Sequence, residues 1–252
     1  MTQTALKHAL LLCVLVLSTA LAQTETPQKT SESEAGTGTI EDQWRFKFRL
    51  SKFEKQFSTT QDKSYGEWDG FIMAGRKNHG FWLSSKGSAY LGDASGSELR
   101  LFYSHNIKPY FGWAVGWRRD TNPNPQRDWL SIGVLGVLPL DIATDVNVFV
   151  GESGRLAARF SVAYRHWLAS GWSLTPDFEF NYYSDDDLER TIGSGLSDID
   201  LGLRLRYHWN QNLWPYAGVV WKGNFGTTAD LIESNGEDSS DLRLTLGLSL
   251  RF

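Results

Sequence analysis

Four histidines, at positions 79, 105, 166 and 208, are the side chains of this sequence best suited to hold a transition metal. Imidazole nitrogen is a common ligand of copper and zinc. The strand pattern described below places all four near the same end of their strands, with His79 and His105 on neighbouring strands. We therefore treat His79, His105, His166 and His208 as candidate metal ligands. Strand parity favours the simpler role of interfacial histidines, because His105 and His166 fall on apolar faces and only His208 falls clearly on a polar one.

Charged residues that recur at every second position form a second candidate site. Alternate residues of a strand share a face, and the opposite faces of these segments are apolar. Charges on such a face are tolerable only inside a barrel, where water or opposite charges satisfy them. An ion-pair network that fills or narrows the lumen is the more ordinary interpretation, and a constriction for a solute is the alternative. The predicted network contains Arg155, Arg159, Asp177, Glu179, Asp198, Asp200, Arg204 and Arg206, and Glu98, Arg100 and Arg243 share its parity.

Two predicted outward loops are acidic. Carboxylates suit calcium or magnesium better than cuprous copper, but their spacing matches no calcium-binding loop. The pattern favours solvated loop tips, or loops bridged by divalent ions to lipopolysaccharide. Specific copper capture by these loops is the less favoured alternative. The residues concerned are Asp185, Asp186, Asp187 and Glu189 in one loop and Asp230, Glu233, Glu237 and Asp238 in the other.

The last nine residues, 244–252, indicate the fold that must position these groups. Leu244, Leu246, Leu248, Leu250 and Phe252 share one strand face, and the intervening residues are small or polar. One face suits lipid and the other suits water, which is the pattern of a transmembrane β-barrel strand. The terminal Phe252 is typical of the targeting signal that the outer-membrane assembly machinery reads. An edge strand of a soluble sandwich is the alternative.

About twelve segments have strand patterns, which predicts an all-β fold: a transmembrane, antiparallel, up-and-down barrel. Long connections, at 121–126, 184–195 and 226–239, alternate with short ones, at 139–140, 169–170 and 210–212, as expected for outward loops and periplasmic turns. The segments around 129–150 alternate poorly, so we assign them no faces. The predicted strands are 43–57, 64–75, 79–90, 96–106, 109–120, 127–138, 141–151, 154–167, 171–183, 196–209, 213–225 and 240–252.

The first 22 residues have the features of a cleaved signal peptide. Lys7 precedes an apolar run at 9–17, and small residues at 20 and 22 allow cleavage before Gln23. Residues 23–42 are rich in Thr, Ser and Glu and are predicted to be a disordered periplasmic tether, followed by the barrel at 43–252. Cys13, the only cysteine, lies in the signal peptide, so we expect no disulfide and no thiolate ligand in the mature protein.

Composition narrows the classes of function. Aromatic residues make up 13% of the chain, with 11 Trp, which suits the two membrane interfaces. The formal charge of −4 becomes −5 without Lys7, because 24 basic residues then face 29 acidic ones, and no basic tract suggests nucleic acid. No phosphate loop, zinc-protease helix or nucleophile elbow is present, so we do not expect an enzyme.

Several motifs in the last two thirds of the chain occur in an order that can be compared with known families. They are Phe81-Trp-Leu83, Ile107-Lys-Pro-Tyr110, Ile192-Gly-Ser-Gly-Leu-Ser-Asp-Ile-Asp-Leu-Gly-Leu-Arg-Leu-Arg-Tyr207, Trp214-Pro-Tyr-Ala-Gly-Val-Val-Trp221, Phe225-Gly-Thr-Thr-Ala-Asp230 and Gly236-Glu-Asp238. From about Trp68 to Phe252 this order resembles the copper resistance protein B family. The resemblance implies an integral outer-membrane barrel of a Gram-negative bacterium, in contact with lipid and lipopolysaccharide. It also implies copper as the ligand and periplasmic copper proteins as partners.

The sequence departs from that family in ways that bear on copper. Members typically carry a Met- and His-rich segment ahead of the barrel, whereas Met73 is the only methionine here after the signal peptide. Acidic residues are common in the family where Lys86 and Val220 stand here. We expect a barrel that acts in copper tolerance by binding copper or controlling its passage. A small-solute channel without metal specificity is the alternative, and an outer-membrane lipid hydrolase is a more distant third.

Overall fold

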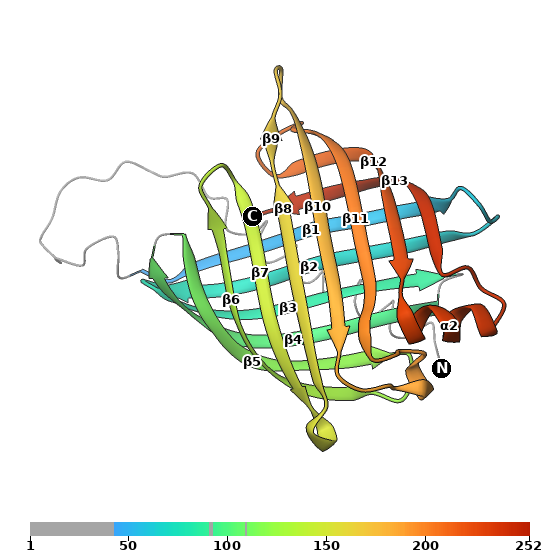
Figure 1. The fold of residues 1–252 in the computed structure, drawn as a ribbon. Helices are drawn as coiled ribbons and strands as arrows, with labels where there is room; N and C mark the ends of the chain where they lie inside the picture. Colours follow the sequence, from blue (N-terminus) through green and yellow to red (C-terminus); the bar gives the residue numbers. More distant parts are fainter. Residues whose placement is uncertain (1–42, 91–92, 109) are drawn as a thin grey trace, which may run out of the picture.

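The computed structural model describes residues 43–90, 93–108 and 110–252, and these form one closed antiparallel β-barrel (Figure 1). The predicted signal peptide (1–22) and tether (23–42) lie outside the described residues. Strands that follow one another in sequence are paired, except that β10 pairs with both β8 and β9, and β1 pairs with β13 to close the sheet. The predicted up-and-down barrel is therefore confirmed.

The described strands lie within a few residues of the predicted ones. The two-residue strand β9 continues β8 after a break at Arg165, and both pair with β10. Together they occupy one strand position, so the barrel has twelve strand positions. The strands are β1 (Arg45–Ser58), β2 (Ser64–Arg76), β3 (His79–Tyr90), β4 (Asp93–Lys108), β5 (Phe111–Asn122), β6 (Arg127–Leu138), β7 (Ile142–Gly151), β8 (Leu156–Tyr164), β9 (His166–Trp167), β10 (Trp172–Tyr183), β11 (Gly195–Tyr207), β12 (Leu213–Asn224) and β13 (Ser240–Arg251).

The barrel is polar inside and apolar outside, which follows from the two-residue period of its strands. On β13, Leu244 and Leu246 are 53% and 58% exposed, whereas Thr245 between them is 1% exposed. On β11, Leu203 and Leu205 point outward while Arg204 is fully buried. The outward leucines match a lipid environment, and the predicted faces of these two strands are confirmed.

Strands β6 and β7 show why their faces could not be assigned from sequence. Val146 and Val148 are exposed on the outer face of β7, yet Phe149, on the inner face, is also apolar and fully buried. Phe149 packs in the lumen with Trp129, Ala157 and Tyr183. An apolar cluster inside the barrel removes the contrast between the two faces, so the alternation in the sequence is lost there.

The two ends of the barrel differ. We call the end with the connections 77–78, 139–141, 168–171 and 208–212 the turn end; β1 begins and β13 ends there. The opposite end, the loop end, carries the longest connections and two short 3-10 helices, η2 (Glu152–Gly154) and η3 (Leu188–Arg190). The two longest connections, 184–194 and 225–239, lie at the loop end as predicted, but the loop-end connections 59–63, 123–126 and 152–155 are no longer than 208–212 at the turn end.

The longest connection contains a helix, α2 (Gly226–Ser234), that the sequence analysis treated only as a loop. Its Thr228 is buried and accepts a hydrogen bond from the backbone N–H of Gly193 at 2.8 Å. A Cβ on Gly193 would lie 2.5 Å from the backbone nitrogen of Thr228, so only glycine allows this approach. The helix is thereby held against the connection between β10 and β11. Within the described ranges, no helix is both long and apolar enough to cross a membrane.

Candidate functional site

Charged side chains from opposite walls meet in the middle of the lumen, where the inward parity of the strands places them. Arg204 on β11 is fully buried and binds Glu54 on β1 through two hydrogen bonds of 2.7 and 2.9 Å. Two strands, β12 and β13, separate β1 from β11 along the barrel wall. Arg204 also binds Asp177 on β10. The Glu54–Arg204 pair therefore joins strands that are not adjacent in the barrel wall.

Glu54 and its neighbour Glu67 on β2 have further partners. The hydroxyl of Tyr216 donates to Glu54 at 2.8 Å, and the amide of Gln56 donates to both Glu54 and Glu67. Lys222 binds Glu67 at 2.7 Å. Removing two charges from water is costly unless each is paired and its remaining oxygens are hydrogen-bonded, and both conditions hold here.

A second group of ion pairs lies beside the first. Lys86 on β3 binds Glu179 on β10, and Ser161 donates to the same carboxylate at 2.8 Å. Arg159 on β8 reaches across to Glu98 on β4 with bonds of 2.7 and 2.9 Å. We call these two groups together the central network; its members are Lys52, Glu54, Glu67, Lys86, Glu98, Arg118, Asp120, Arg159, Asp177, Glu179, Asp200, Arg204 and Lys222. Such contacts fill the middle of the lumen.

The structure places the predicted lumenal residues in three environments. Asp177, Glu179, Asp200, Arg159 and Arg204 belong to the central network. Asp198 is hydrogen-bonded to Asn181 at 2.7 Å beside it.

The other two predicted arginines lie away from the network. Arg206 lies nearer the turn end, with its guanidinium over the Tyr216 ring, and Arg155 lies at the loop end, bound to Asp187 at 2.7 Å. Sequence reasoning missed seven members of the central network, although the same inward parity on β1, β2, β3, β5 and β12 would have identified them: Lys52, Glu54, Glu67, Lys86, Arg118, Asp120 and Lys222.

Asp187 was predicted to lie at a solvated loop tip, and the structure shows a different environment. It is buried and receives hydrogen bonds from Arg127 at 2.8 and 3.0 Å and from Arg155. Burial alone would raise the pKa of Asp187, but the hydrogen bonds and charge of Arg127, with the charge of Arg155, outweigh it and hold the pKa below its usual range. Arg190, three residues on, donates to the backbone carbonyls of Asn122, Pro123 and Pro125. These bonds tie the connections of the loop end together.

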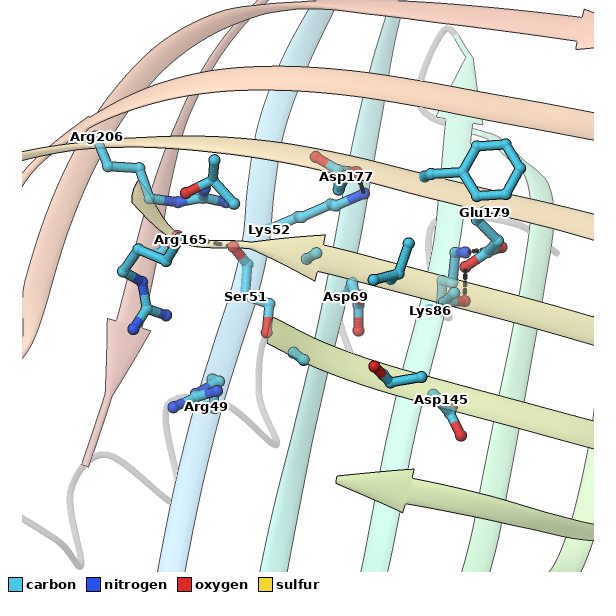
Figure 2. A pocket seen from close by; sticks show the side chains of 18 of the residues that line it. Arg49, Ser51, Lys52, Asp69, Lys86, Asp145, Arg165, Asp177, Glu179 and Arg206 are labelled. Atoms are coloured by element: carbon cyan, nitrogen blue, oxygen red, sulfur yellow. Dashed lines mark hydrogen bonds and ion pairs between the residues drawn. The ribbon is translucent and has the colours of Figure 1, made fainter. Parts of the chain in front are cut away.

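A cavity of about 270 Å³ opens in the lumen on the turn-end side of the central network. Figure 2 shows Arg49, Arg165 and Arg206 gathered at one end of this cavity. At the other end, Lys52 meets Asp177 and Lys86 meets Glu179. The lumen is thus filled at its middle and hollow towards the turn end.

The four candidate histidines do not converge on one site. His79 and His105 are cross-strand partners on β3 and β4, and their Nδ1 atoms lie 3.4 Å apart. Both belong to an aromatic cluster with Tyr103 and Trp113 on the outer face at the turn end, and the Tyr103 hydroxyl contacts Nδ1 of His79. His166 is exposed and lies beside the Tyr164 hydroxyl at 3.1 Å.

His208 lies in a different environment, on the lumenal side. Its ring stands between the rings of Trp167 and Trp214, and Nε2 lies 2.7 Å from the hydroxyl oxygen of Ser173. A serine in contact with an imidazole forms two thirds of a hydrolase triad. In the part of the chain that the structure describes, no carboxylate is hydrogen-bonded to the His208 ring, and no three His, Cys, Asp or Glu side chains group as a metal site.

Comparisons with known proteins agree with this architecture. The sequence model of the family described as "Copper resistance protein B precursor (CopB)" matches residues 44–252. The copper resistance protein B of Escherichia coli is 33% identical over 171 residues, which are 68% of this chain and 58% of that protein. The homolog from Pseudomonas syringae pv. tomato is 32% identical over 197 residues, covering 78% and 67%. The chain thus spans somewhat over half the length of the first of these relatives.

Solved porins share the fold at low sequence identity. The KdgM porin has a TM-score of 0.51 at 15% identity, covering 81% of this chain and 99% of that one. The NanC porin has a TM-score of 0.53 at 13% identity, covering 82% and 99%. These likenesses concern the barrel alone. The family match and the apolar outer face of the strands indicate a barrel of the outer-membrane type.

Proposed function

Because the chain belongs to the copper resistance protein B family, we propose that it acts in copper tolerance by binding copper at the turn end of the barrel. In this proposal the turn end faces the periplasm, since the long connections of outer-membrane barrels face outward. The observation that supports binding is the contact between His79 and His105, whose Nδ1 atoms are 3.4 Å apart.

The geometry of this histidine pair fits two ligands of a single ion. Imidazole nitrogens bind metals at about 2.0–2.1 Å, so two of them at a tetrahedral angle lie about 3.3 Å apart. His79 is exposed and His105 is half-buried, so an ion has access to the pair from the interfacial side. The Tyr103 hydroxyl contacts the same Nδ1 of His79, so copper would replace that contact on binding. When bound, copper would be held by His79 and His105.

Passage of copper is less well supported than binding. The central network fills the lumen at mid-height with pairs such as Lys86–Glu179, which join opposite walls of the barrel. A copper ion that passed through the barrel would have to separate these buried pairs, at a cost of several kcal/mol each. We therefore place copper at the rim of the barrel and regard the lumen as a barrier.

A copper titration by calorimetry of the mature protein in detergent, with zinc as competitor, tests the proposal. His79→Ala and His105→Ala are each expected to weaken copper binding by about tenfold or more, as loss of a ligand or its support commonly does. His166→Ala is the matched control, because His166 also lies exposed near the turn end but has no second imidazole beside it. We expect its affinity to equal that of the wild type.

Two results would contradict copper binding at the pair. One is wild-type protein that shows only weak association removed by salt. The other is an equal loss of affinity in His166→Ala, or a loss confined to His208→Ala, which would move the site elsewhere.

A small-solute channel is the second candidate, and the cavity of about 270 Å³ favours it. Single-channel recording in planar lipid bilayers separates the two functions. A lumen filled by the central network predicts no steady conductance. Stable openings of the wild-type protein, unaffected by His79→Ala, would instead support the channel.

A further inference from the structure

We propose that the cavity on the turn-end side of the central network is a binding site for a small oxyanion, with a carboxylate or phosphate group held by Arg49, Arg206 and Arg251. This site is independent of copper, since it lies inside the lumen and the histidine pair lies on the outer face.

The first observation is a set of arginines without carboxylate partners. Arg49 on β1 and Arg251 on β13 are direct cross-strand partners, an arrangement of like charges that costs stability. Arg206 on β11 is 8% exposed. Among the described residues, none of these three guanidinium groups makes an ion pair or a side-chain hydrogen bond. Arg49, Arg206 and Arg251 instead lie over the rings of Phe71, Tyr216 and Trp214, respectively.

A fourth arginine adds to the positive charge. Arg165 and Arg251 both lie over the ring of Trp214, with their guanidinium carbons 5.2 and 5.1 Å from its centroid. Arg165 is bound to Asp141 at 2.8 Å, so one carboxylate serves this group of four guanidiniums. The turn-end half of the cavity therefore carries about three positive charges that no ion pair among the described residues balances, and a bound anion can do so.

The carboxylates that line the same cavity do not balance these charges, because they already lie against other lysines and arginines of the lumen. Asp177 binds Lys52 and Arg204, and Glu179 binds Lys86. Asp145 and Asp200 bind Arg100 and Lys222, respectively. Asp69 stands directly opposite Lys52 on one neighbouring strand and Lys86 on the other. Acidic groups thus belong to the central network, and free basic groups collect towards the turn end.

The second, independent observation is an unpartnered polar group in the wall. Thr175 on β10 lines the cavity and is 8% exposed, and its hydroxyl oxygen has no hydrogen-bond partner. Nε of Arg165 is likewise buried without a partner. A buried donor left unsatisfied costs about 1–3 kcal/mol, so such groups mark a place where a ligand or water completes the site.

The cavity has room for an organic anion. A single water needs about 10–15 Å³ of such volume, and the cavity measures about 270 Å³. Guanidinium groups bind carboxylate and phosphate oxygens in pairs, through two parallel N–H bonds. Arginines that line a partly enclosed cavity are therefore suited to an oxyanion of several atoms.

Calorimetric titration of the mature protein at low ionic strength tests this site, with sodium citrate as the carboxylate probe and sodium phosphate as the phosphate probe. We expect saturable binding of at least one of them. Arg206→Gln is expected to weaken it by about tenfold or more, since a charged hydrogen bond is lost. Arg49→Gln should have a similar effect and should fold readily, because it removes a like-charge pair.

Lys55→Gln is the matched control. Lys55 lies on the same strand as Arg49 but on the exposed outer face, and its loss changes the net charge by the same amount. Its affinity for citrate or phosphate should remain that of the wild type. Absence of saturable binding of both anions to the folded wild-type protein would overturn the proposal. An equal weakening in Lys55→Gln would do so too, because it would reveal general electrostatic attraction.

Discussion

The central network and the arginine-lined cavity occupy the same lumen and use the same kinds of side chain, yet their charges are organised in opposite ways. In the central network, Arg204 is held by Glu54 and Asp177 from opposite sides. Two residues further along β11, Arg206 has no carboxylate partner among the described residues. The comparison shows that inward parity alone does not give a charged residue its role. Pairing across the lumen decides whether the residue closes the barrel or remains available to a ligand.

Substitution of Arg204 should have the largest effect. Arg204→Ala leaves Glu54 buried without its partner, and breaking such a pair typically costs about 3–5 kcal/mol. We expect the free energy of unfolding to fall by about that amount, measured by urea titration in lipid vesicles with tryptophan fluorescence as the signal.

Arg206→Ala is the control for that experiment, with the same residue type on the same strand. A ring contact to Tyr216 is lost there together with an unpaired buried charge, so the expected change in the free energy of unfolding is about 1 kcal/mol or less. Equal losses in the two variants would mean that the distinction between the central network and the cavity has no energetic basis.

Asp187 at the loop end extends the comparison to a paired carboxylate outside the membrane. Its pKa is held below the usual range by Arg127 and Arg155 in spite of burial, so its contribution is present above the unfolded pKa of about 3.9 and is lost as pH falls through the lower folded pKa. Asp187→Asn should therefore reduce the free energy of unfolding by about 1–3 kcal/mol at pH 7.

The pH dependence provides the check on Asp187. The difference in unfolding free energy between wild type and Asp187→Asn should shrink as pH falls below about 4, because the Asp187 carboxylate of the unfolded state becomes protonated there while that of the folded state is still ionised. Asp185→Asn is the control, because Asp185 has no arginine partner in the described structure. A difference that stays constant down to pH 3 would show that the charge of Asp187 does not contribute.

Much of the fold was predictable because a barrel strand repeats a two-residue pattern that the sequence displays directly. The strand limits, the closing strand 240–252 and the inward charges of β8 and β11 follow from that pattern. It fails where the lumen itself is apolar, as at Phe149 on β7. It also gives no indication of α2, whose position depends on Thr228 packing against a distant connection.

The sequence predicted which residues face the lumen better than it predicted which residues pair with one another there. Alternation placed Asp177, Arg204 and Arg206 on the inner face. It did not show which of them would form an ion pair or with which residue, because β1 and β11 come together only when the sheet closes. The separation between Arg155 and the central network has the same cause: depth along the barrel axis depends on strand tilt, which the period of two does not contain. Adjacency of His79 and His105 was predictable, since β3 and β4 form a simple hairpin.

The smallest expected effect, and the sharpest distinction between the two regions, concerns Arg49. Its direct opposition to Arg251 destabilises the empty cavity, so Arg49→Gln should raise the free energy of unfolding by about 0.2–1 kcal/mol in anion-free buffer. Substitutions in the central network are expected to do the opposite. Urea titration without phosphate or carboxylate buffers measures the effect, with Lys55→Gln as the control of equal charge.

Addition of citrate should then reverse the order of the two proteins. A ligand that binds only the folded state stabilises it by about 2.7 kcal/mol at a hundredfold excess over its Kd, and Arg49→Gln, which binds more weakly, gains less. Wild type should therefore be the less stable protein without citrate and the more stable one with it. If Arg49→Gln is less stable than wild type in both buffers, Arg49 stabilises the barrel in the same way as Arg204, and the cavity is a continuation of the central network. A reversal of order requires that the arginines of the turn end are destabilising by themselves and are stabilised by an anion.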